Sequence, residues 1–413
     1  MENKVEQKVQ AVEFEEGALK VHKLTFWEAA MIIVGANIGS GILGLPYSAR
    51  KAGWPILMVW LIIAGFFTTA SMLYVAETTL RTKRAMQLPG LATKYVGALG
   101  SWLVFFSVAA NTIGCLIAYT NGSGRILSEI LGVSTQVGSL LFTIPAALVV
   151  WFGLKATGVA EKIISFGMIA LLAIIIVASF MAGNSSVSKA IYTNWTYAVP
   201  VFNVAIFCYI AQYAVPELAR GLAHKPQKLA PAITTGMTMT MVLLALVPLA
   251  VLSLTGPENV SQVATIAWGK ALGQWAFFVA NVFALCAMMT SYWAVAESFL
   301  TSMVDKFECK SETDFKTRII CLAAVIIPPF ILAYSGLVSF VDAIYLAGTF
   351  GGVIMSILPV MMLKSARKNG DMEPAWKCGW VANPVIQWLM IILFCGAAIY
   401  AIAGILGYLP AAW

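Results

Sequence analysis

A glycine-rich stretch stands where the first hydrophobic segment of the chain should be most regular. Residues 35–46 read Gly-Ala-Asn-Ile-Gly-Ser-Gly-Ile-Leu-Gly-Leu-Pro. Each glycine inside a helix costs about 1 kcal/mol relative to alanine, and a proline costs about 3 kcal/mol. A broken helix leaves backbone N–H and C=O groups free to bind the charged groups of a solute or an ion. The alternative, close packing of small residues, explains the glycines better than it explains Asn37, Ser40 and Pro46.

The composition is typical of an integral membrane protein. Of the 413 residues, 60% are hydrophobic and 11% are charged. A helix needs about 20 apolar residues to cross a bilayer, and eleven segments meet this length. They lie near residues 27–49, 55–80, 99–130, 136–154, 159–182, 197–219, 230–255, 268–304, 317–335, 338–363 and 383–410. The sequence therefore predicts an all-α protein with eleven spans in the lipid bilayer, an N-terminal tail over residues 1–26 and no soluble domain.

The distribution of the 26 Lys and Arg residues predicts the orientation of the spans. On one side of the membrane lie only five of them, Arg50, Lys51, Arg125, Lys189 and Lys270. Because cytoplasmic loops carry the excess of positive charge, the N-terminus is predicted to be cytoplasmic and the C-terminus external. Short tails and loops favour a prokaryotic plasma membrane. The net charge of +7 follows from this topology, and no basic domain for nucleic acid is expected.

Four carboxylates lie inside predicted spans, where ionisable groups are functional candidates. Glu77, Glu217 and Glu297 lie toward the cytoplasmic ends of their spans, so each is either a proton carrier or a solvated side chain. Asp342 lies near the outer end of its span, and Arg50 ends the first span at the same face. These two residues could form an external gate, an exposed ion pair that stabilises closure by about 0–1 kcal/mol.

Weak internal similarities suggest a repeat. They recur about 170 positions apart: residues 45–50 and 215–220 share Pro, Ala and Arg, residues 98–102 and 271–275 share Ala-Leu-Gly-X-Trp, and Asn111 corresponds to Asn281. This offset is five spans, an odd number, so the second unit is inverted relative to the first. The sequence predicts one five-helix repeat over residues 27–183, an inverted one over residues 196–363 and an additional helix over residues 383–410, with spans one and six broken.

Two motifs carry a family resemblance. The stretch 35–46, followed by Ala52-Gly53-Trp54, resembles the first helix of the amino acid/auxin permease family. The sequence Thr290-Ser291-Tyr292 in span eight is also similar to the aromatic amino acid permeases. The resemblance covers the whole chain and implies the LeuT-type fold, with two inverted five-helix units plus one additional helix here. It also implies uptake of an amino acid together with Na⁺ or H⁺.

A broken helix supplies what a zwitterionic amino acid needs, because its N–H groups bind a carboxylate and its carbonyls bind an ammonium. Gly39, Ser40 and Gly41 are predicted to hold the carboxylate, with Ile42 beside them. The second break should precede Pro216, although no glycine marks its position. The resemblance adds a side-chain pocket and gate from span six and a substrate-facing tyrosine from span three, at Phe207, Cys208, Tyr209, Ala211 and Tyr119. For the tyrosine, the alternative is an aromatic residue at the outer membrane interface.

The resemblance also implies a sodium site. Similar transporters bind Na⁺ through two hydroxyls of span eight and through backbone carbonyls, which correspond here to Thr290 and Ser291 and to Gly35, Ile38 and Ala287. Without the resemblance, such a hydroxyl pair more often bonds a carbonyl of its own helix. Some proton-driven relatives place a lysine of span five at the ion position, and residues 164–168 contain none. Na⁺ is therefore the favoured coupling ion.

The sequence thus predicts a symporter that takes a neutral amino acid into the cell by alternating access. Two alternatives remain open, namely a proton-coupled symporter of the same fold and an uncoupled facilitator. An enzyme is not expected, because the two histidines lie outside the spans and no metal motif or nucleophile–base pair is recognisable. No cofactor besides the coupling ion is predicted, and the sequence does not select the amino acid.

Overall fold

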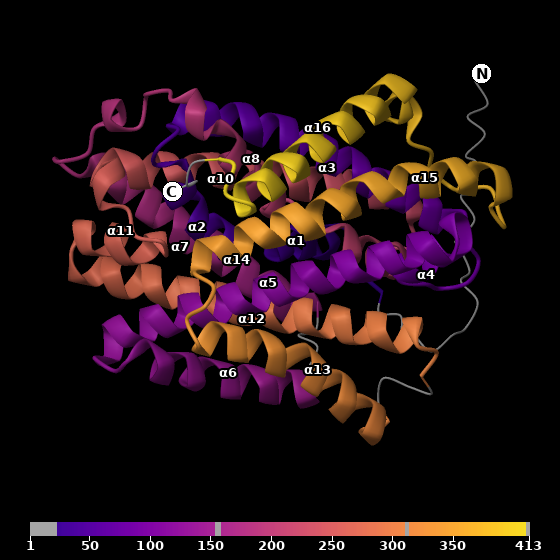
Figure 1. Cartoon of the computed structure of the whole chain (residues 1–413), viewed down its shortest axis with the longest axis horizontal. Coiled ribbons are helices and arrows are strands. Elements are labelled where there is room, and N and C mark those ends of the chain that lie inside the picture. The colour runs from indigo at the N-terminus through magenta and orange to yellow at the C-terminus, as the bar shows by residue number, and fades with distance from the viewer. Residues whose placement is uncertain (1–22, 153–157, 310–313, 410–413) are drawn as a thin grey trace, which may run out of the picture.

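The computed structural model describes residues 23–152, 158–309 and 314–409, and within these ranges the chain is helical and has no strand. Most of the helices run side by side along the longest axis of the molecule (Figure 1). Their bounds are α1 (Phe26–Asn37), α2 (Ser40–Ala49), α3 (Trp54–Leu80), α4 (Leu88–Val96), α5 (Ala98–Leu131), α6 (Thr135–Phe152), α7 (Gly158–Met181), α8 (Ala198–Phe207), α9 (Val215–Gly221), α10 (Leu229–Thr255), α11 (Ala264–Leu272), α12 (Gln274–Lys306), α13 (Phe315–Tyr334), α14 (Phe340–Leu346), α15 (Val353–Asn369) and α16 (Pro384–Ile405).

The described residues contain nine helical segments that are long and apolar enough to cross a membrane. A tenth is the pair α1 and α2, which are bent by 47° at a short break. In α7, the stretch Phe166–Met181 is apolar but shorter. The structure therefore has nine or ten spans by length and composition, and the predicted number of eleven depends on α7. Residues 1–22 of the predicted tail and residue 410 of the predicted last helix lie outside the described residues.

Two short helices that the sequence did not predict precede the long helices α5 and α12. A glycine with positive φ separates α4 from α5 and α11 from α12, at 92° for Gly97 and 105° for Gly273. The predicted start of span eight at residue 268 is therefore wrong, because the chain turns at Gly273 and α12 begins after it. A Cβ at either glycine would meet nothing within 4 Å, so the backbone angle rather than space requires glycine.

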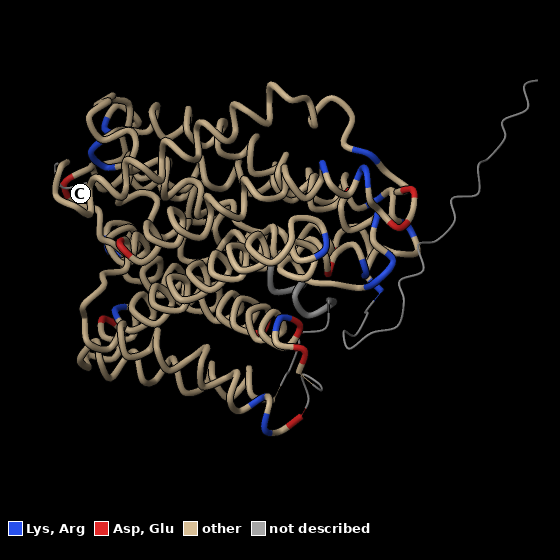
Figure 2. Tube along the Cα trace, turned by 45° about the vertical axis from the view of Figure 1, so that its right-hand side comes forward, with Lys and Arg blue, Asp and Glu red and all other residues tan. Residues whose placement is uncertain are grey.

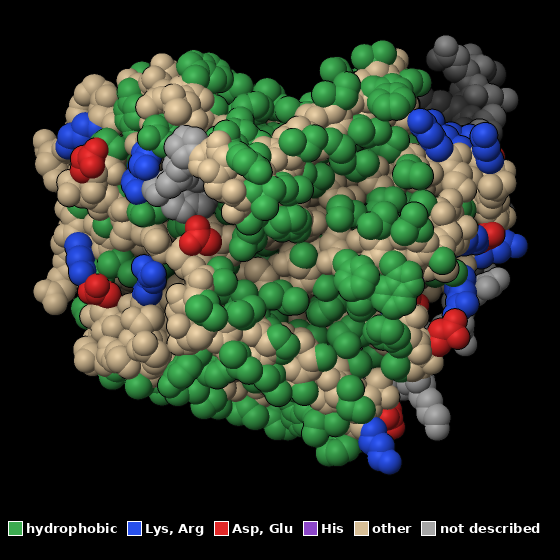
Figure 3. Space-filling view, in the orientation of Figure 1, with side chains coloured by type: hydrophobic (Ala, Val, Ile, Leu, Met, Phe, Trp, Pro, Cys, Tyr) green, Lys and Arg blue, Asp and Glu red, His purple; other side chains and the backbone are tan. Residues whose placement is uncertain are grey.

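The broken spans lie at the centre of the bundle. Among the nine spans, the apolar 18-residue stretch within Trp195–Gly221, which includes α8 and α9, has the largest share of buried residues at 89%. The corresponding stretches of α6 and α13 are 33% buried and that of α16 is 22% buried. Helix α2 packs against α8 and α10, and α8 packs against α3. Hydrophobic side chains cover the middle of the face seen in Figure 3, between two ends that carry charged residues. The outer helices therefore present an apolar surface and enclose the breaks.

Lys and Arg gather at one end of the bundle, beside α4 and the end of α15 (Figure 2). We call this the basic end; its described members include Arg81, Lys83, Lys94, Lys306 and Arg367, which bond groups on or beside α4 and the end of α15. Figure 2 shows fewer Lys and Arg at the opposite end. This is the asymmetry from which the cytoplasmic side was predicted, and the orientation in the membrane stays a prediction.

Candidate functional site

The first break lies within the glycine-rich stretch, as predicted. Helix α1 begins with a capping box formed by Thr25 and Glu28 and ends at Asn37. Ile38 (φ −88°, ψ 66°) and Gly39 (φ −116°, ψ −133°) leave the helical conformation before α2 begins at Ser40. The first N–H groups of α2 and the last carbonyls of α1 therefore have no partner within their own helices.

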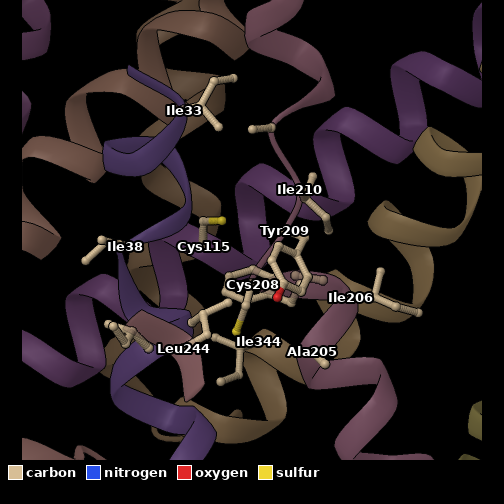
Figure 4. Close-up of a cluster of buried hydrophobic side chains, with 14 of the residues drawn as sticks. Ile33, Ile38, Cys115, Ala205, Ile206, Cys208, Tyr209, Ile210, Leu244 and Ile344 are labelled. Carbon is tan, nitrogen blue, oxygen red and sulfur yellow. The ribbon is translucent and has the colours of Figure 1, made fainter. Parts of the chain in front are cut away.

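The second break separates α8 from α9. After Phe207 the chain forms an irregular turn, then a short 3₁₀ helix, η3 (Gln212–Ala214), before α9 begins. Pro216 has no N–H to donate to the Gln212 carbonyl, so an α-helix cannot continue regularly through this point. Figure 4 shows Cys208, Tyr209 and Ile210 in the turn that follows α8, in one cluster of buried side chains with Ile38 of the first break. The predicted second break is thus present without a glycine.

Both breaks face one small cavity. Its lining comes from the first break (Ala36, Asn37, Gly39, Ser40, Gly41), from α5 (Asn111, Cys115, Tyr119), from the second break (Phe207, Ile210, Tyr213) and from α12 (Val295). The volume open to the centre of a water molecule is about 10 Å³, which is room for about one water. The three α5 residues are spaced by four, so they lie on one face of that helix.

Three buried polar atoms at this cavity have no hydrogen-bond partner among the described residues. They are Oδ1 of Asn37, Oγ of Ser40 and Oδ1 of Asn111. The three residues are 3%, 0% and 3% exposed. A buried polar group without a partner costs about 1–3 kcal/mol, so polar groups that enter the cavity would find bonding atoms already in place. No carboxylate or histidine lines the cavity.

The glycines of the first break let neighbouring side chains approach the backbone closely. A Cβ at Gly39 would lie 2.7 Å from the Tyr119 hydroxyl oxygen, and a Cβ at Gly41 would lie 2.7 Å from Cys208 Sγ. Both distances are too short for a real Cβ, so a side chain at either position would force these neighbours to move. The absence of a side chain is therefore required by packing against α5 at Gly39 and against the second break at Gly41.

The structure brings together most of the predicted substrate residues. Gly39, Ser40, Gly41, Tyr119 and Phe207 line the cavity, and Cys208 contacts the Gly41 position. Three others are buried but do not line it: Ile42, Tyr209 and Ala211. The Tyr209 ring instead packs against α3, where a Cβ at Gly65 would lie 3.1 Å from Cζ of the tyrosine.

The predicted ion ligands divide into two groups. Ser291 Oγ donates a hydrogen bond to the Gly35 carbonyl (3.3 Å) and lies beside the Tyr119 hydroxyl. Thr290 bonds its own helix, since its hydroxyl donates to the carbonyls of Cys286 and Ala287, both at 3.1 Å. The described residues contain no group of three His, Cys, Asp or Glu that could hold a metal ion. A cation between α1 and α12 would therefore have hydroxyl and carbonyl oxygens as ligands.

The predicted gate residues, Arg50 and Asp342, do not pair with each other. Arg50 lies over the ring of Tyr47 at 3.5 Å and donates to the Tyr47 carbonyl at 3.1 Å. Asp342 accepts a hydrogen bond from the Ser339 hydroxyl at the start of α14 (2.5 Å). The predicted ion pair is therefore not formed in this structure, because each side chain has a local partner.

Two of the predicted proton carriers are held in ion pairs near the basic end. Glu77 is fully buried, and its carboxylate accepts hydrogen bonds from Arg81 (3.0 Å), Arg367 (2.8 Å) and the Cys378 N–H (2.8 Å). These contacts tie α3 to α15 and to the loop that follows it. Glu297 pairs with Arg318 at 3.2 Å, whereas Glu217 is exposed. None of the three lies at the cavity.

Several lining residues were not predicted from the sequence. Asn111 and Cys115 lie eight and four positions before Tyr119, and Val295 lies four positions after Ser291. Helical spacing from a predicted residue was the signal that could have found them. Ile210 and Tyr213 had no comparable signal, because the exact extent of the second break depends on tertiary packing.

The chain is similar to known proteins along nearly its whole length. The model of the tryptophan/tyrosine permease family matches residues 22–403. The tryptophan-specific transport protein of Pseudomonas aeruginosa (strain UCBPP-PA14) is 24% identical over 392 residues, covering 88% of this chain and 91% of that protein. The tyrosine-specific transport system 1 of Haemophilus influenzae is also 24% identical, over 404 residues that cover 92% of this chain and 98% of that protein.

Solved structures show the same fold at low sequence identity. One is a crystal structure of the Eremococcus coleocola manganese transporter in complex with an aromatic bis-isothiourea substituted compound. It has a TM-score of 0.64 at 12% identity, and the match covers 98% of this chain and 93% of the transporter chain. A mutant of that transporter has a TM-score of 0.61 at 13% identity, with 97% and 91% covered. At these identities the likeness concerns the fold alone.

These comparisons correct one of the two resemblances and agree with the other, which likened residues 290–292 to the aromatic amino acid permeases. The glycine-rich stretch resembles the amino acid/auxin permeases, but the family match over residues 22–403 is to a related family. Its members among the relatives are transporters and not enzymes. The chain belongs to the tryptophan/tyrosine permease family.

Proposed function

We propose that this protein is an ion-coupled symporter that carries tryptophan or tyrosine into the cell across a plasma membrane by alternating access. The names of its relatives, tryptophan-specific and tyrosine-specific transporters, support an aromatic amino acid as the substrate. The observation that carries the proposal is that two unwound segments from different spans face one cavity with unpartnered polar atoms. This is the arrangement that secondary transporters use for substrates near the bilayer midplane.

The first break provides the contacts for the amino and carboxyl groups. The free N–H groups at the start of α2, from Ser40 onward, lie at the positive end of the helix dipole and suit a carboxylate. The unpartnered Ser40 hydroxyl adds a further donor to the same end of the cavity. The last carbonyls of α1, near Asn37, and the Asn37 side-chain oxygen suit the ammonium group.

Sodium is our preferred coupling ion. Ser291 and the Gly35 carbonyl already lie in hydrogen-bond contact between α12 and α1, so an ion placed there would be held by the same helix that binds the substrate. A proton would need a titratable carrier, and Glu77 and Glu297 are in ion pairs while Glu217 is exposed. Proton coupling and uncoupled facilitation remain the alternatives.

Transport requires the two breaks to move relative to each other. A cavity with room for about one water is smaller than the sites of about 300 Å³ or more that hold small-molecule ligands. We expect α1, α2, α8 and α9 to rotate about their unwound segments, opening the cavity first to one side of the membrane and then to the other. The external gate would then form when Arg50 and Asp342 exchange their local partners for each other.

A LeuT-type inverted repeat is part of this proposal. Two observations support it: each half of the chain has one broken span, and the junctions at Gly97 and Gly273 place a short helix before a long one in each half. The two glycine junctions, Gly97 and Gly273, are 176 residues apart. Ala98 follows its junction and opens α5, whereas Ala271 precedes its junction and lies in α11. These two alanines are therefore not structural counterparts. The repeat units would span residues 27–183 and 196–363.

Accumulation of amino acid in liposomes tests the proposed function. Purified protein is reconstituted, and uptake of labelled tryptophan and tyrosine is measured under an imposed Na⁺ gradient, an imposed H⁺ gradient, or neither. One elementary charge that crosses 100 mV provides about 2.3 kcal/mol, enough for nearly 50-fold accumulation of a neutral substrate. We expect accumulation with Na⁺. Equal movement without a gradient would leave a facilitator, and accumulation with H⁺ alone would make the protein a proton symporter.

A further inference from the structure

One polar group at the cavity has no role in binding the backbone atoms of an amino acid. Asn111 lies on α5 with its side chain 3% exposed, and its Oδ1 has no hydrogen-bond partner among the described residues. Native proteins leave few buried polar atoms without partners, and each one requires an explanation. Because Asn111 lines the cavity, a group inside the cavity is the available partner.

Asn111 and Tyr119 line the same cavity about two helical turns apart on α5. Tyr119, which is close to Gly39 and Ser291, is eight residues further along α5, about 12 Å at the rise of an α-helix. Cys115 stands between them on the same helix face. A ligand whose carboxylate lies at Gly39 would therefore extend its side chain along α5 toward Asn111.

Packing holds Asn111 in place against a stretch of π-helix, η6 (Ala347–Gly352), that joins α14 to α15. A Cβ at Gly351 would lie 2.7 Å from the Asn111 Cβ, and the Ser107 hydroxyl donates to the Gly351 carbonyl (2.5 Å). Such close contact restricts the α5 backbone on the side of η6. The Asn111 amide is thus presented from a fixed position.

Apolar side chains from the second break and from α12 also line the cavity. Phe207 packs between η6 and α2. A Cβ placed on Gly348 of η6 would lie 3.0 Å from Phe207 Cβ, and a Cβ placed on Gly41 of α2 would lie 3.2 Å from Phe207 Cδ1. Val295 of α12 also lines the cavity. An aromatic ring placed here would contact apolar side chains and would meet one amide.

We propose that Asn111 is a specificity residue that accepts a hydrogen bond from the ring of the substrate, from the indole N–H of tryptophan or the phenol O–H of tyrosine. The inference rests on the proposed function. A site that is built to bond a ring N–H or O–H rejects an analogue that lacks it, because the buried amide is then left without a partner. Phenylalanine is such an analogue. The hydrogen-bond donor on the ring, rather than its aromatic character, would then define the substrate class.

Paired ligands and paired variants test the role of Asn111. Binding to purified protein is measured for tryptophan, for its benzothienyl analogue, in which sulfur replaces the indole N–H, and for tyrosine and phenylalanine. In the wild-type protein we expect each donor-bearing ligand to bind at least about tenfold more tightly than its partner. In Asn111→Ala this preference should fall to about onefold, mainly through weaker binding of tryptophan and tyrosine.

Asn281→Ala is the matched control. Asn281 is also a buried asparagine with an unpartnered Oδ1, but its amide donates to the Phe277 carbonyl (2.8 Å) and it does not line the cavity. This variant should keep the wild-type preference. A second variant, Asn111→Ser, serves if Asn111→Ala does not fold.

Equal binding of tryptophan and the benzothienyl analogue by the wild-type protein would overturn the inference without any variant. An unchanged preference in Asn111→Ala or in Asn111→Ser would overturn it as well. If the wild-type protein binds none of the four ligands, the proposed function fails instead, so the two failures can be told apart.

Discussion

Replacing Gly41 by alanine should drive apart the two broken spans. The new Cβ would lie 2.7 Å from Cys208 Sγ and 3.2 Å from Phe207 Cδ1. Ordinary contacts of a Cβ begin at 3.4 Å, so the sulfur must retreat by about 0.7 Å, which is the difference between these distances. Cys208 is only 1% exposed, and surrounding atoms leave it little room. Overpacking of this kind costs about 1–3 kcal/mol.

Removal of the sulfur should relieve most of this strain. The double variant Gly41→Ala/Cys208→Ala no longer has the Cys208 Sγ atom. The closest remaining neighbour of the new Cβ at position 41 is then Phe207 Cδ1, at 3.2 Å. We expect the double variant to be more stable than the sum of the two single variants, with a coupling energy of about 0.5–3 kcal/mol. Gly41→Ala alone should also weaken binding of tryptophan at least tenfold, since α2 is proposed to hold the carboxylate.

The assay is a double-mutant cycle on four purified proteins. Thermal unfolding in detergent gives the stability of each, and tryptophan binding gives the functional effect. Gly167→Ala in α7 is the control, because a Cβ there meets nothing within 4 Å and alanine is the better helix former. Strictly additive effects, or a Gly41→Ala protein as stable as the control, would refute the close approach of α2 to the second break.

Three further changes test other contacts. Glu77→Gln breaks a buried ion pair and should destabilise the protein by about 3 kcal/mol or more in thermal unfolding. The control Glu217→Gln, at an exposed position, should change the stability by less than about 0.5 kcal/mol. Equal effects of the two variants would mean that the Glu77 network contributes nothing. Asp371 lies in the loop after α15. Its partial burial raises its pKa, but the ammonium group and backbone N–H of two lysines lower it more, so the pKa lies below its ordinary value. The resulting stability is present above the unfolded-state pKa of about 3.9 and is lost as the pH falls through the lower folded-state value. Asp371→Asn should therefore unfold with less dependence on pH between about pH 5 and pH 3, and an unchanged pH profile would contradict this. Ser291→Ala should raise the Na⁺ concentration for half-maximal uptake by about tenfold, or about 1.4 kcal/mol, and Thr290→Ala should raise it less; full uptake in choline at fixed pH would remove Na⁺ from the mechanism.

The sequence was sufficient where local chemistry determines the structure. Five residues between 35 and 46 are glycine or proline, and their cost in a regular helix locates the first break without any tertiary information. Long apolar runs likewise predict most spans to within a few residues. Both features follow from the bilayer, which requires every exposed backbone group to be satisfied within its own helix.

Tertiary packing determines what the sequence left open. The second break has no glycine, and its extent depends on how Cys208 meets Gly41 and how Gln212 bonds Ser356. Helix α11 continues an apolar run, so only the conformation of Gly273 separates it from α12. Arg50 and Asp342 were placed at the same face, but the local partners that each of them takes could not be inferred from their positions in the chain.

The deep burial of the second broken span has a consequence for how the protein is made. An apolar 18-residue stretch within Trp195–Gly221 is 89% buried, so in the finished bundle its unwound backbone is sheltered from lipid. A span that enters the bilayer before its neighbours has no such shelter, and each unsatisfied group would cost several kcal/mol there. We therefore expect this segment to insert with more helix than it finally keeps, kinked at Pro216, and to reach its unwound form only when α2, α3 and α15 close around it. The break would then be a late product of assembly, formed by the same helix contacts that enclose the cavity.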